Sequence, residues 1–442
     1  NLESIEVVKG PAQLYGRTEP GGLINLNTKR GLDSPYYSIE QSVGSYSFYR
    51  TQWDAGGPIT PGNEFQYRFS GSYQDNDSFR DFVSSDRLLL NPSVTWRPAP
   101  GTDITIDVEY QKKKALADFG IPVIGRRPAD IPISRNLGDP NTPRGYQDTL
   151  MIGSEINHKL NADWAIHHRF LYTHGDSVNT FVNPAPAFNA AQAFNETTGI
   201  MQRNIFQQRS EQEVYSTNLD LTGKLDIAGT RHDLLVGVDY YRSHNLYGSD
   251  GQWVTPNPAL TIDIFNPGPS YGIARSVFDA ALKTSATALP RSDIYNQWHG
   301  VYVQDQVTIG KKLHLMLGGR YDWAETGRGR ATTFSAATEA LFNSTPSVIR
   351  KDQGFSPRLG VLYEFTPTLS GYGTWTTSFG ANNAPAANGR TFDPQVGEQY
   401  ELGLKAQLFE SRLLGTLAAY KLTKDNILVA DLNTADPNDR IA

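Results

Sequence analysis

The chain has 442 residues, of which 38% are hydrophobic and 11% aromatic, and it contains 40 Gly, 26 Pro and no Cys. The lack of Cys excludes disulfides and Cys-based metal sites, and a formal net charge of -6 without a long basic run argues against nucleic acid as a partner. No apolar stretch approaches the roughly 20 residues of a transmembrane helix. The abundance of aromatics, Gly and Pro favours strands and turns over helices.

The first 33 residues contain two short apolar runs that flank Pro20-Gly21-Gly22. Pro followed by two Gly predicts a turn, with a positive φ or a close approach of two backbone segments at the glycines. The rest of the chain has the pattern of β-strands. The role of this first segment therefore has to be inferred from the sequence that follows it.

From there on, apolar and polar side chains alternate with the period of a β-strand. In Phe65–Tyr73 every odd position except Gly71 is aromatic and every even one polar. The stretches Ile104–Tyr110 and Leu313–Trp323 alternate in the same way. We count about fifteen predicted strands.

The predicted connections fall into two classes that alternate along the chain. The short ones are 57–63, 98–102, 161–163, 228–230, 310–311, 366–368 and 409–411. The others, after a tight turn near Ser45, are long: 75–85, 113–147, 175–210, 247–295, 325–352 and 379–396. An outer-membrane barrel sorts its connections in this way, with short periplasmic turns and long extracellular loops. Trp96, Trp164, Trp323 and Trp375 near predicted strand ends fit its aromatic girdles.

Fifteen strands would leave two unpaired edges in hydrocarbon, where each unsatisfied backbone group is costly. The chain also begins without Met. We therefore expect the sequence to lack C-terminal strands and its true N-terminus.

Several motifs, in this order along essentially the whole chain, resemble those of TonB-dependent siderophore receptors. In the first segment they are Ile5–Ala12, Leu14–Arg17, Glu19–Asn25 and Thr28–Arg30; in the strands they are Ser78–Phe82, Gly300–Gln306, Gly318–Trp323, Phe355–Gly360 and Gly397–Lys405. The resemblance extends to the ferric hydroxamate (ferrichrome and ferrioxamine) branch. The first segment departs from the family by one residue fewer between Gly10-Pro11 and Leu14.

The resemblance implies an all-β fold, a transmembrane antiparallel β-barrel of 22 strands with an N-terminal plug domain in its lumen. Residues 1–33 would be the C-terminal part of the plug, and residues 34–442 the barrel without its C-terminal strands. It also implies a multi-pass outer-membrane protein of a Gram-negative bacterium, which binds a ferric siderophore and imports it with energy from TonB. TonB, with ExbB and ExbD, would act through the missing N-terminal region. We expect a monomer in contact with outer-membrane lipid and lipopolysaccharide, with no enzymatic reaction and no intrinsic cofactor.

The resemblance to the hydroxamate branch maps ligand-binding aromatics onto Phe119, Phe181 and Tyr271. Ring faces and hydroxyls suit a compact chelate that needs apolar contact and few orienting polar groups. Packing inside the loops is the alternative role for each of the three.

A contact between plug and barrel is implied at Lys9 and Glu401. Lys stands where the family usually has Arg, so a bidentate fork to the carboxylate is lost. The pair would either latch the plug until energy arrives or be a static ion pair that adds little net stability.

No catalytic residue and no metal ligand is predicted. His167 and His168 lie on one strand and point to opposite faces, so they cannot bind one metal together. An Fe(III)-siderophore carries its own iron ligands.

Three other functions remain open at this point. A TonB-dependent receptor for cobalamin, haem or an oligosaccharide would differ in its loops. A passive porin would share the barrel but has no need of residues 1–33. A soluble adhesin or glycan-binding module would have mixed loop lengths at both ends.

Overall fold

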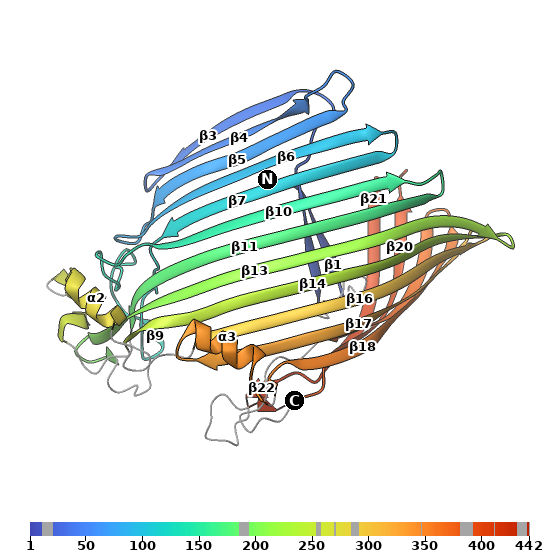
Figure 1. Ribbon diagram of the computed structural model, residues 1–442. Helices are drawn as coiled ribbons and strands as arrows, with labels where there is room; N and C mark the ends of the chain where they lie inside the picture. Colours follow the sequence, from blue (N-terminus) through green and yellow to red (C-terminus); the bar gives the residue numbers. More distant parts are fainter. Residues whose placement is uncertain are drawn as a thin grey trace.

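The computed structural model describes residues 1–10, 21–184, 194–252, 258–268, 271–283, 291–345, 347–380, 392–410, 412–430 and 440–441. Fifteen long strands form one antiparallel sheet that curls into a barrel wall (Figure 1), as the alternation predicts. They are β3 (Tyr36–Gly44), β4 (Phe48–Pro58), β5 (Phe65–Asp77), β6 (Ser84–Ala99), β7 (Thr102–Ala115), β10 (Gly145–Lys159), β11 (Trp164–Pro184), β13 (Ile200–Ile227), β14 (Thr230–Gln252), β16 (Arg291–Ile309), β17 (Leu313–Ala331), β18 (Arg350–Thr366), β19 (Leu369–Gly380), β20 (Gln395–Leu408) and β21 (Leu413–Asp425).

Small elements accompany the wall. The hairpin of β1 (Leu2–Lys9) and β2 (Gly22–Thr28) lies behind the wall in Figure 1. The long connections carry β8 (Val123–Ile124), β9 (Arg127–Pro128), β12 (Phe194–Asn195), β15 (Thr261–Asp263), β22 (Val429–Ala430), β23 (Arg440–Ile441), the 3-10 turn η2 (Pro258–Leu260) and the helices α2 (Arg275–Lys283) and α3 (Phe334–Phe342). No helix in the described ranges is long and apolar enough to cross a membrane.

Successive wall strands pair in antiparallel register from β3 to β21. The barrel order places β21 next to β3, but no residue register joins these two strands in the described part of the chain. The residue-by-residue pairing runs without a break from β3 to β21. We therefore treat β3 and β21 as the two edge strands of the sheet. Side chains of both strands are largely exposed.

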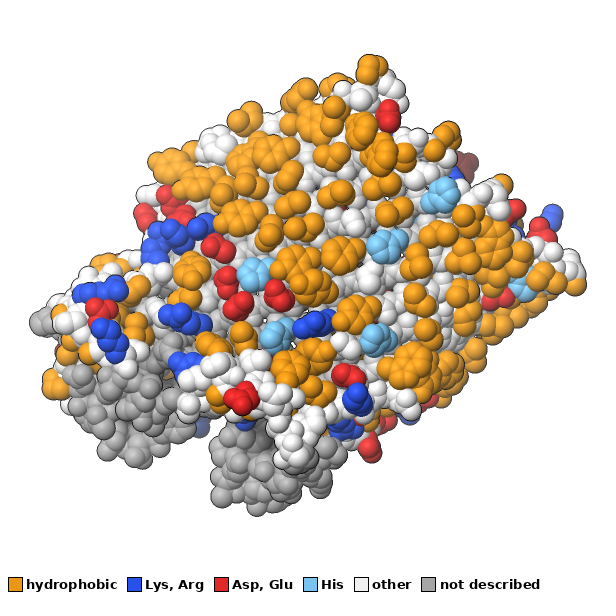
Figure 2. Space-filling view, viewed as in Figure 1, with side chains coloured by type: hydrophobic (Ala, Val, Ile, Leu, Met, Phe, Trp, Pro, Cys, Tyr) orange, Lys and Arg blue, Asp and Glu red, His pale blue; other side chains and the backbone are white. Residues whose placement is uncertain are grey.

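The two faces of the wall differ as the period-two pattern predicts. On β5, Gln66, Arg68 and Ser70 are buried, whereas Phe69 and Tyr73 are exposed on the other face. The buried polar face is the inner one, since the segment after β2 contacts it. Figure 2 shows hydrophobic side chains spread over the outer face, with charged ones gathered toward the strand ends.

Long and short connections alternate between the two ends of the strands, as predicted, but several predicted loops are too long. β11 runs to Pro184 and β13 begins at Ile200, so the predicted loop 175–210 shrinks to 185–199. β14 likewise extends to Gln252 and β17 to Ala331. The extensions of β11 and β13 carry charged side chains on the outer face, Asp176 and Arg209, and so lack the apolar outer face of a membrane-spanning strand. Their backbone ladders nevertheless continue.

Candidate functional site

Two of the three predicted ligand-binding aromatics meet near the end of the barrel that carries the long connections. The Phe119 ring packs edge-on against Phe181, with 5.5 Å between centroids, and Phe181 stacks on Phe206 at 4.7 Å. Phe181 and Phe206 are register partners on β11 and β13 and face inward, whereas Phe119 comes from the loop after β7 and is 47% exposed. The result is an apolar platform with one ring open to solvent.

Phe206 is a member of this platform that the sequence analysis missed. It lies in the polar stretch Arg203–Gln207, and only the register of β11 with β13 brings it beside Phe181. Phe206 could be predicted as a neighbour of Phe181 only if the register between β11 and β13 were already known.

An ion pair holds the loop that carries Phe119. Arg80, which is 6% exposed, contacts the Asp118 carboxylate through Nε at 2.7 Å and Nη2 at 3.2 Å, and its Nη1 donates to the Ile133 carbonyl at 2.5 Å. The Gly120 N–H donates to Asp118 Oδ1 at 3.0 Å. Burial alone would raise the pKa of Asp118, but the hydrogen bonds from Arg80 and Gly120 and the charge of Arg80 together lower it.

Tyr271 lies elsewhere in the loops. Its hydroxyl donates to the Asn136 carbonyl, and its ring meets Phe82 edge-on at 5.3 Å. It is half-buried, and burial raises its pKa. Among the described residues no ring contact joins Tyr271 to Phe119 or Phe181, and its hydrogen bond and ring contact are with other loop residues. Its role in binding stays a prediction.

A buried arginine on β13 joins two of the long connections, 116–144 and 253–290, into one body. Arg203 is fully buried; it donates to the carbonyls of Gly138 at 2.6 Å and Leu260 at 3.1 Å and lies 3.8 Å from Asp139. Asp139 in turn accepts from the Gly272 and Ile273 N–H groups at 3.0 Å. Two buried apolar clusters fill the body around these bonds. The loops beside the aromatic platform are therefore packed.

The segment after β2 is tied to the inner face of the wall by charge. Lys29 Nζ lies 2.6 Å from Asp54 on β4, and Arg30 Nη2 lies 2.5 Å from Glu155 on β10. At the end of the strands that carries the short connections, Asp33 accepts a hydrogen bond from Arg97 at 2.8 Å. Contacts with β4, β6 and β10 fix this segment across several strands.

Lys9 and Glu401, the residues of the predicted contact between plug and barrel, have separate surroundings in the structure. Glu401 accepts from the Tyr372 hydroxyl at 2.5 Å and from Gln399 Nε2 at 2.9 Å, and Lys9 is exposed. No ion pair between Lys9 and Glu401 is found in the described part of the chain. A Cβ on Gly10 would lie 2.6 Å from Gln399, so this end of the hairpin does approach β20. The pairing itself stays a prediction.

The Pro-Gly-Gly turn lies partly outside the described residues, because Pro20 is not among them. Gly22 has a φ of 116°, and a Cβ there would lie 2.0 Å from the Val8 carbonyl oxygen. Both the positive φ and the close backbone approach expected of this turn are therefore present at Gly22.

The predicted histidine pair points to opposite faces. His167 Nδ1 lies 2.6 Å from Asn157 Oδ1, whereas His168 Nε2 lies 3.0 Å from Thr217 Oγ1 on the other face of the sheet. Their side chains therefore lie on different faces of the wall, as the strand period predicts.

Comparison with known proteins gives the family. The family described as "TonB dependent receptor-like, beta-barrel" matches residues 93–441. The metal-pseudopaline receptor CntO of Pseudomonas aeruginosa is 30% identical over 433 residues, which are 97% of this chain and 58% of that protein. The ferrichrome outer membrane transporter/phage receptor of Escherichia coli is 27% identical over 452 residues, covering 97% of this chain and 57% of the relative.

Solved structures have the same fold. The pyoverdine outer membrane receptor FpvA from Pseudomonas aeruginosa, bound to pyoverdine, superposes with a TM-score of 0.81 at 21% identity, over 98% of this chain and 60% of that one. The chain thus spans somewhat more than half the length of the relatives it matches. Matched over most of its length, and folded as an outer-membrane barrel, the chain belongs to the TonB-dependent receptor family.

Proposed function

We propose that the whole protein is a receptor that binds a ferric siderophore outside the cell and imports it with energy from TonB, without catalysing a reaction. The observation that carries the proposal is the first segment, held to the inner face of the barrel through Lys29–Asp54 and Arg30–Glu155. A passive porin has no need of a segment bound inside its wall. Residues 1–33 are accordingly proposed as the end of a plug and residues 34–442 as barrel.

The proposed cargo class rests on the relatives. Those that match across the chain include receptors named for metal-pseudopaline, ferrichrome, ferric pyoverdine and ferrioxamine. All four names denote metal chelates, and a chelate needs no metal ligand from the protein. We propose a ferric hydroxamate first, and make other chelates outcomes of the test.

The proposed contact surface is the platform of Phe119, Phe181 and Phe206. Its aromatic rings lie on the inner side of the wall, next to the packed loops. Such a surface suits a chelate that presents apolar groups and needs few hydrogen bonds for its orientation. Tyr271 is kept as a secondary candidate, since its hydroxyl already donates to the Asn136 carbonyl.

The partners and assembly are proposals as well. TonB with ExbB and ExbD would pull the plug, and outer-membrane lipid and lipopolysaccharide would surround a monomer. The edges β3 and β21 would pair with further strands of the full-length receptor, because an open edge in hydrocarbon leaves backbone groups unsatisfied.

The test is a fluorescence titration of the full-length receptor in detergent with ferrichrome, ferrioxamine, a ferric catecholate and cobalamin. We expect saturable quenching by a ferric hydroxamate, and weaker binding in Phe119→Ala. Phe342→Ala is the matched control, because Phe342 is similarly exposed but belongs to α3 on the outer side of the wall.

Binding of the catecholate or cobalamin alone would keep the receptor and replace the cargo. If Phe119→Ala and the wild type bind the ferric hydroxamate with equal affinity, the aromatic platform is not part of the binding site. Failure of every ligand, together with free passage of small solutes through vesicles that contain the protein, would favour the porin.

A further inference from the structure

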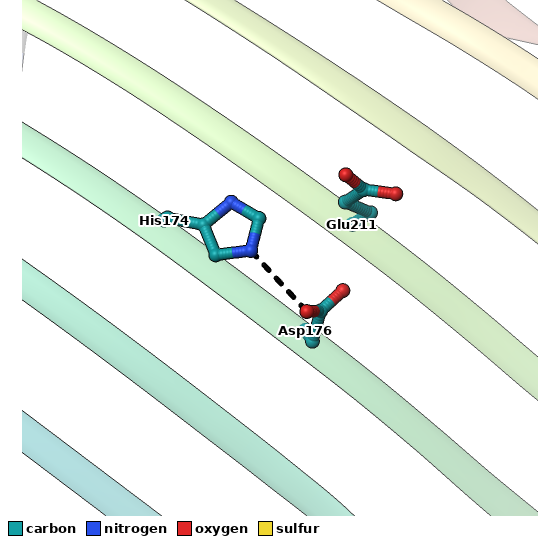
Figure 3. A group of neighbouring side chains, drawn as sticks. All are labelled: His174, Asp176 and Glu211. Carbon is teal, nitrogen blue, oxygen red and sulfur yellow. Dashed lines mark hydrogen bonds and ion pairs between the residues drawn. The ribbon is translucent and has the colours of Figure 1, made fainter.

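Three side chains that can bind a metal meet on the outer face of the wall. His174 and Asp176 are two residues apart on β11 and share a face, and Asp176 is the direct register partner of Glu211 on β13. Each offers one donor atom, and these atoms all lie within 4.8 Å of one another. Figure 3 shows the imidazole and the two carboxylates gathered from the two neighbouring strands.

The environment of His174 favours a metal-binding imidazole. Its Nε2 lies 3.2 Å from Asp176 Oδ2, so this nitrogen faces the carboxylates. Its Nδ1 is buried without a hydrogen-bond partner and lies 4.0 Å from Glu213 Oε1. Metal-bound histidines commonly donate their second ring N–H to a carboxylate, which orients the ring. Glu213 is placed for that role after a small rotation, and the Tyr172 hydroxyl donates to it at 3.3 Å.

The cluster carries negative charge without a basic counterpart. In the described part of the chain neither Asp176 nor Glu211 lies within salt-bridge distance of a Lys or Arg side chain. The neighbouring acid Asp148 has Lys112 at 3.8 Å. Carboxylates directly opposite each other on neighbouring strands repel, so Asp176 and Glu211 would be stabilised by a shared cation.

The position of the cluster separates it from the cargo path. Next to it, toward the membrane, Tyr172 and Tyr215 pack with 4.9 Å between ring centroids on the same outer face, as expected of an aromatic girdle. The Phe119 platform contacts the inner face. The cluster therefore lies at headgroup level outside the barrel, where water or lipid phosphate oxygens can complete a coordination sphere.

We propose that His174, Asp176 and Glu211 bind one divalent first-row metal ion of the Zn²⁺ type, with Glu213 as the carboxylate that orients His174. Imidazole together with carboxylates suits such ions, whereas Mg²⁺ and Ca²⁺ prefer oxygen ligands alone. Three protein ligands leave a position open to the outside. This proposal does not depend on the siderophore function.

The test is calorimetric titration of the full-length, chelator-treated receptor in detergent with ZnCl₂. We expect saturation at one ion per protein, with affinity lowered roughly tenfold or more in Asp176→Asn and Glu211→Gln, and about 10–100-fold in Glu213→Gln. Asp305→Asn is the matched control: it removes a carboxylate 2.7 Å from His232 Nδ1, at the opposite end of the strands, and should leave the affinity unchanged.

Anomalous diffraction at the zinc edge from soaked crystals would place the ion between β11 and β13. Absence of saturable heat in the wild type would overturn the proposal. So would equal affinities in Asp176→Asn and Asp305→Asn, with both variants shown to be folded by their resistance to unfolding in SDS. Siderophore binding should be the same in all of these variants, so either proposal can fail without the other.

Discussion

The Arg80–Asp118 pair determines where Phe119 can be. The Arg80 guanidinium donates three hydrogen bonds, two to Asp118 and one to the Ile133 carbonyl, and it is almost fully buried. The sequence identifies Ser78–Phe82 as a motif that resembles the family and predicts Phe119 as a binding residue, but nothing in the sequence connects the two. Contacts between residues 38 positions apart depend on how two loops pack, and local patterns carry no information about that.

The lowered pKa of Asp118 predicts how the Phe119 loop responds to acid. A carboxyl group whose pKa is depressed by folding stabilises the fold above its ordinary value of about 3.9, and this contribution is lost as the pH falls through the lowered pKa. We expect amide exchange in the loop 116–122, corrected for its intrinsic rate, to be unchanged between about pH 7 and pH 5 and to rise in stronger acid.

The control for this effect is Asp118→Asn, whose side chain does not titrate. In that variant the loop should exchange faster at neutral pH and lose its acid response. If the loop exchange of Asp118→Asn still rises in acid over the same pH range as that of the wild type, another group controls the acid response.

The β1–β2 hairpin depends on one backbone position. Gly22 has a positive φ and its Cα faces the Val8 carbonyl, so Gly22→Ala meets both a left-handed backbone and a steric clash. A strained residue of this kind costs about 1–3 kcal/mol. We expect faster amide exchange in the hairpin of Gly22→Ala, with the barrel unaffected.

Gly21→Ala is the matched control for Gly22→Ala, because a Cβ at Gly21 would have no heavy atom within 4 Å. Its exchange should resemble that of the wild type. Equal effects of the two substitutions would show that the hairpin is not limited by the approach of Gly22 to β1.

We propose the segment after the hairpin as a second anchor of the first segment, beside the predicted contact between Lys9 and Glu401. Arg30→Ala removes the first segment's side of the ion pair with Glu155, whereas Arg169→Ala removes a second arginine, 3.4 Å from the same carboxylate, that belongs to the wall. If residues 1–33 are the end of a plug, as proposed, we expect Arg30→Ala to loosen it and to make cells more sensitive to large antibiotics. Arg169→Ala should change this little.

Glu401→Ala distinguishes the two anchors. If the latch at Glu401 dominates, this variant should be more sensitive to antibiotics than Arg30→Ala. The opposite order would assign the anchor to Arg30 and Glu155. Protein levels in the outer membrane have to be equal for either conclusion.

For the strands, the alternation of apolar and polar side chains predicted correctly where each strand lies but not where it ends. Where the outer face meets lipid, as at Phe69 and Tyr73, hydrophobicity marks every second residue. Farther along β11 and β13 the outer face carries His174, Asp176 and Glu211, and the polar contrast disappears while the hydrogen-bonded ladder continues. The backbone does not require an apolar side chain in order to pair, so the predicted loop 175–210 was too long.

For the molecule as a whole, the two faces of one strand fix its orientation in the membrane. On β13 Leu219 points outward and is 46% exposed, beside Val238 of β14. The next residue on each side faces the lumen: Asn218 donates to Asp220 at 3.0 Å, and Asp220 accepts from the Tyr302 hydroxyl. Adjacent residues of β13 therefore face the hydrocarbon of the membrane and the polar interior of the barrel in turn.

This arrangement predicts that the same substitution is destabilising at one position and tolerated at the adjacent one. Leu219→Arg places a charge in lipid, which costs about 2–4 kcal/mol near the middle of the bilayer. Asn218→Arg places the same side chain in the lumen beside the Asp220 carboxylate, where it can pair. The fraction of full-length receptor that resists unfolding in SDS after assembly into the outer membrane should fall in Leu219→Arg and stay near wild type in Asn218→Arg. The reverse order would mean that β13 presents the other face to lipid, and would place the Phe119 platform and the His174 cluster on exchanged sides of the wall.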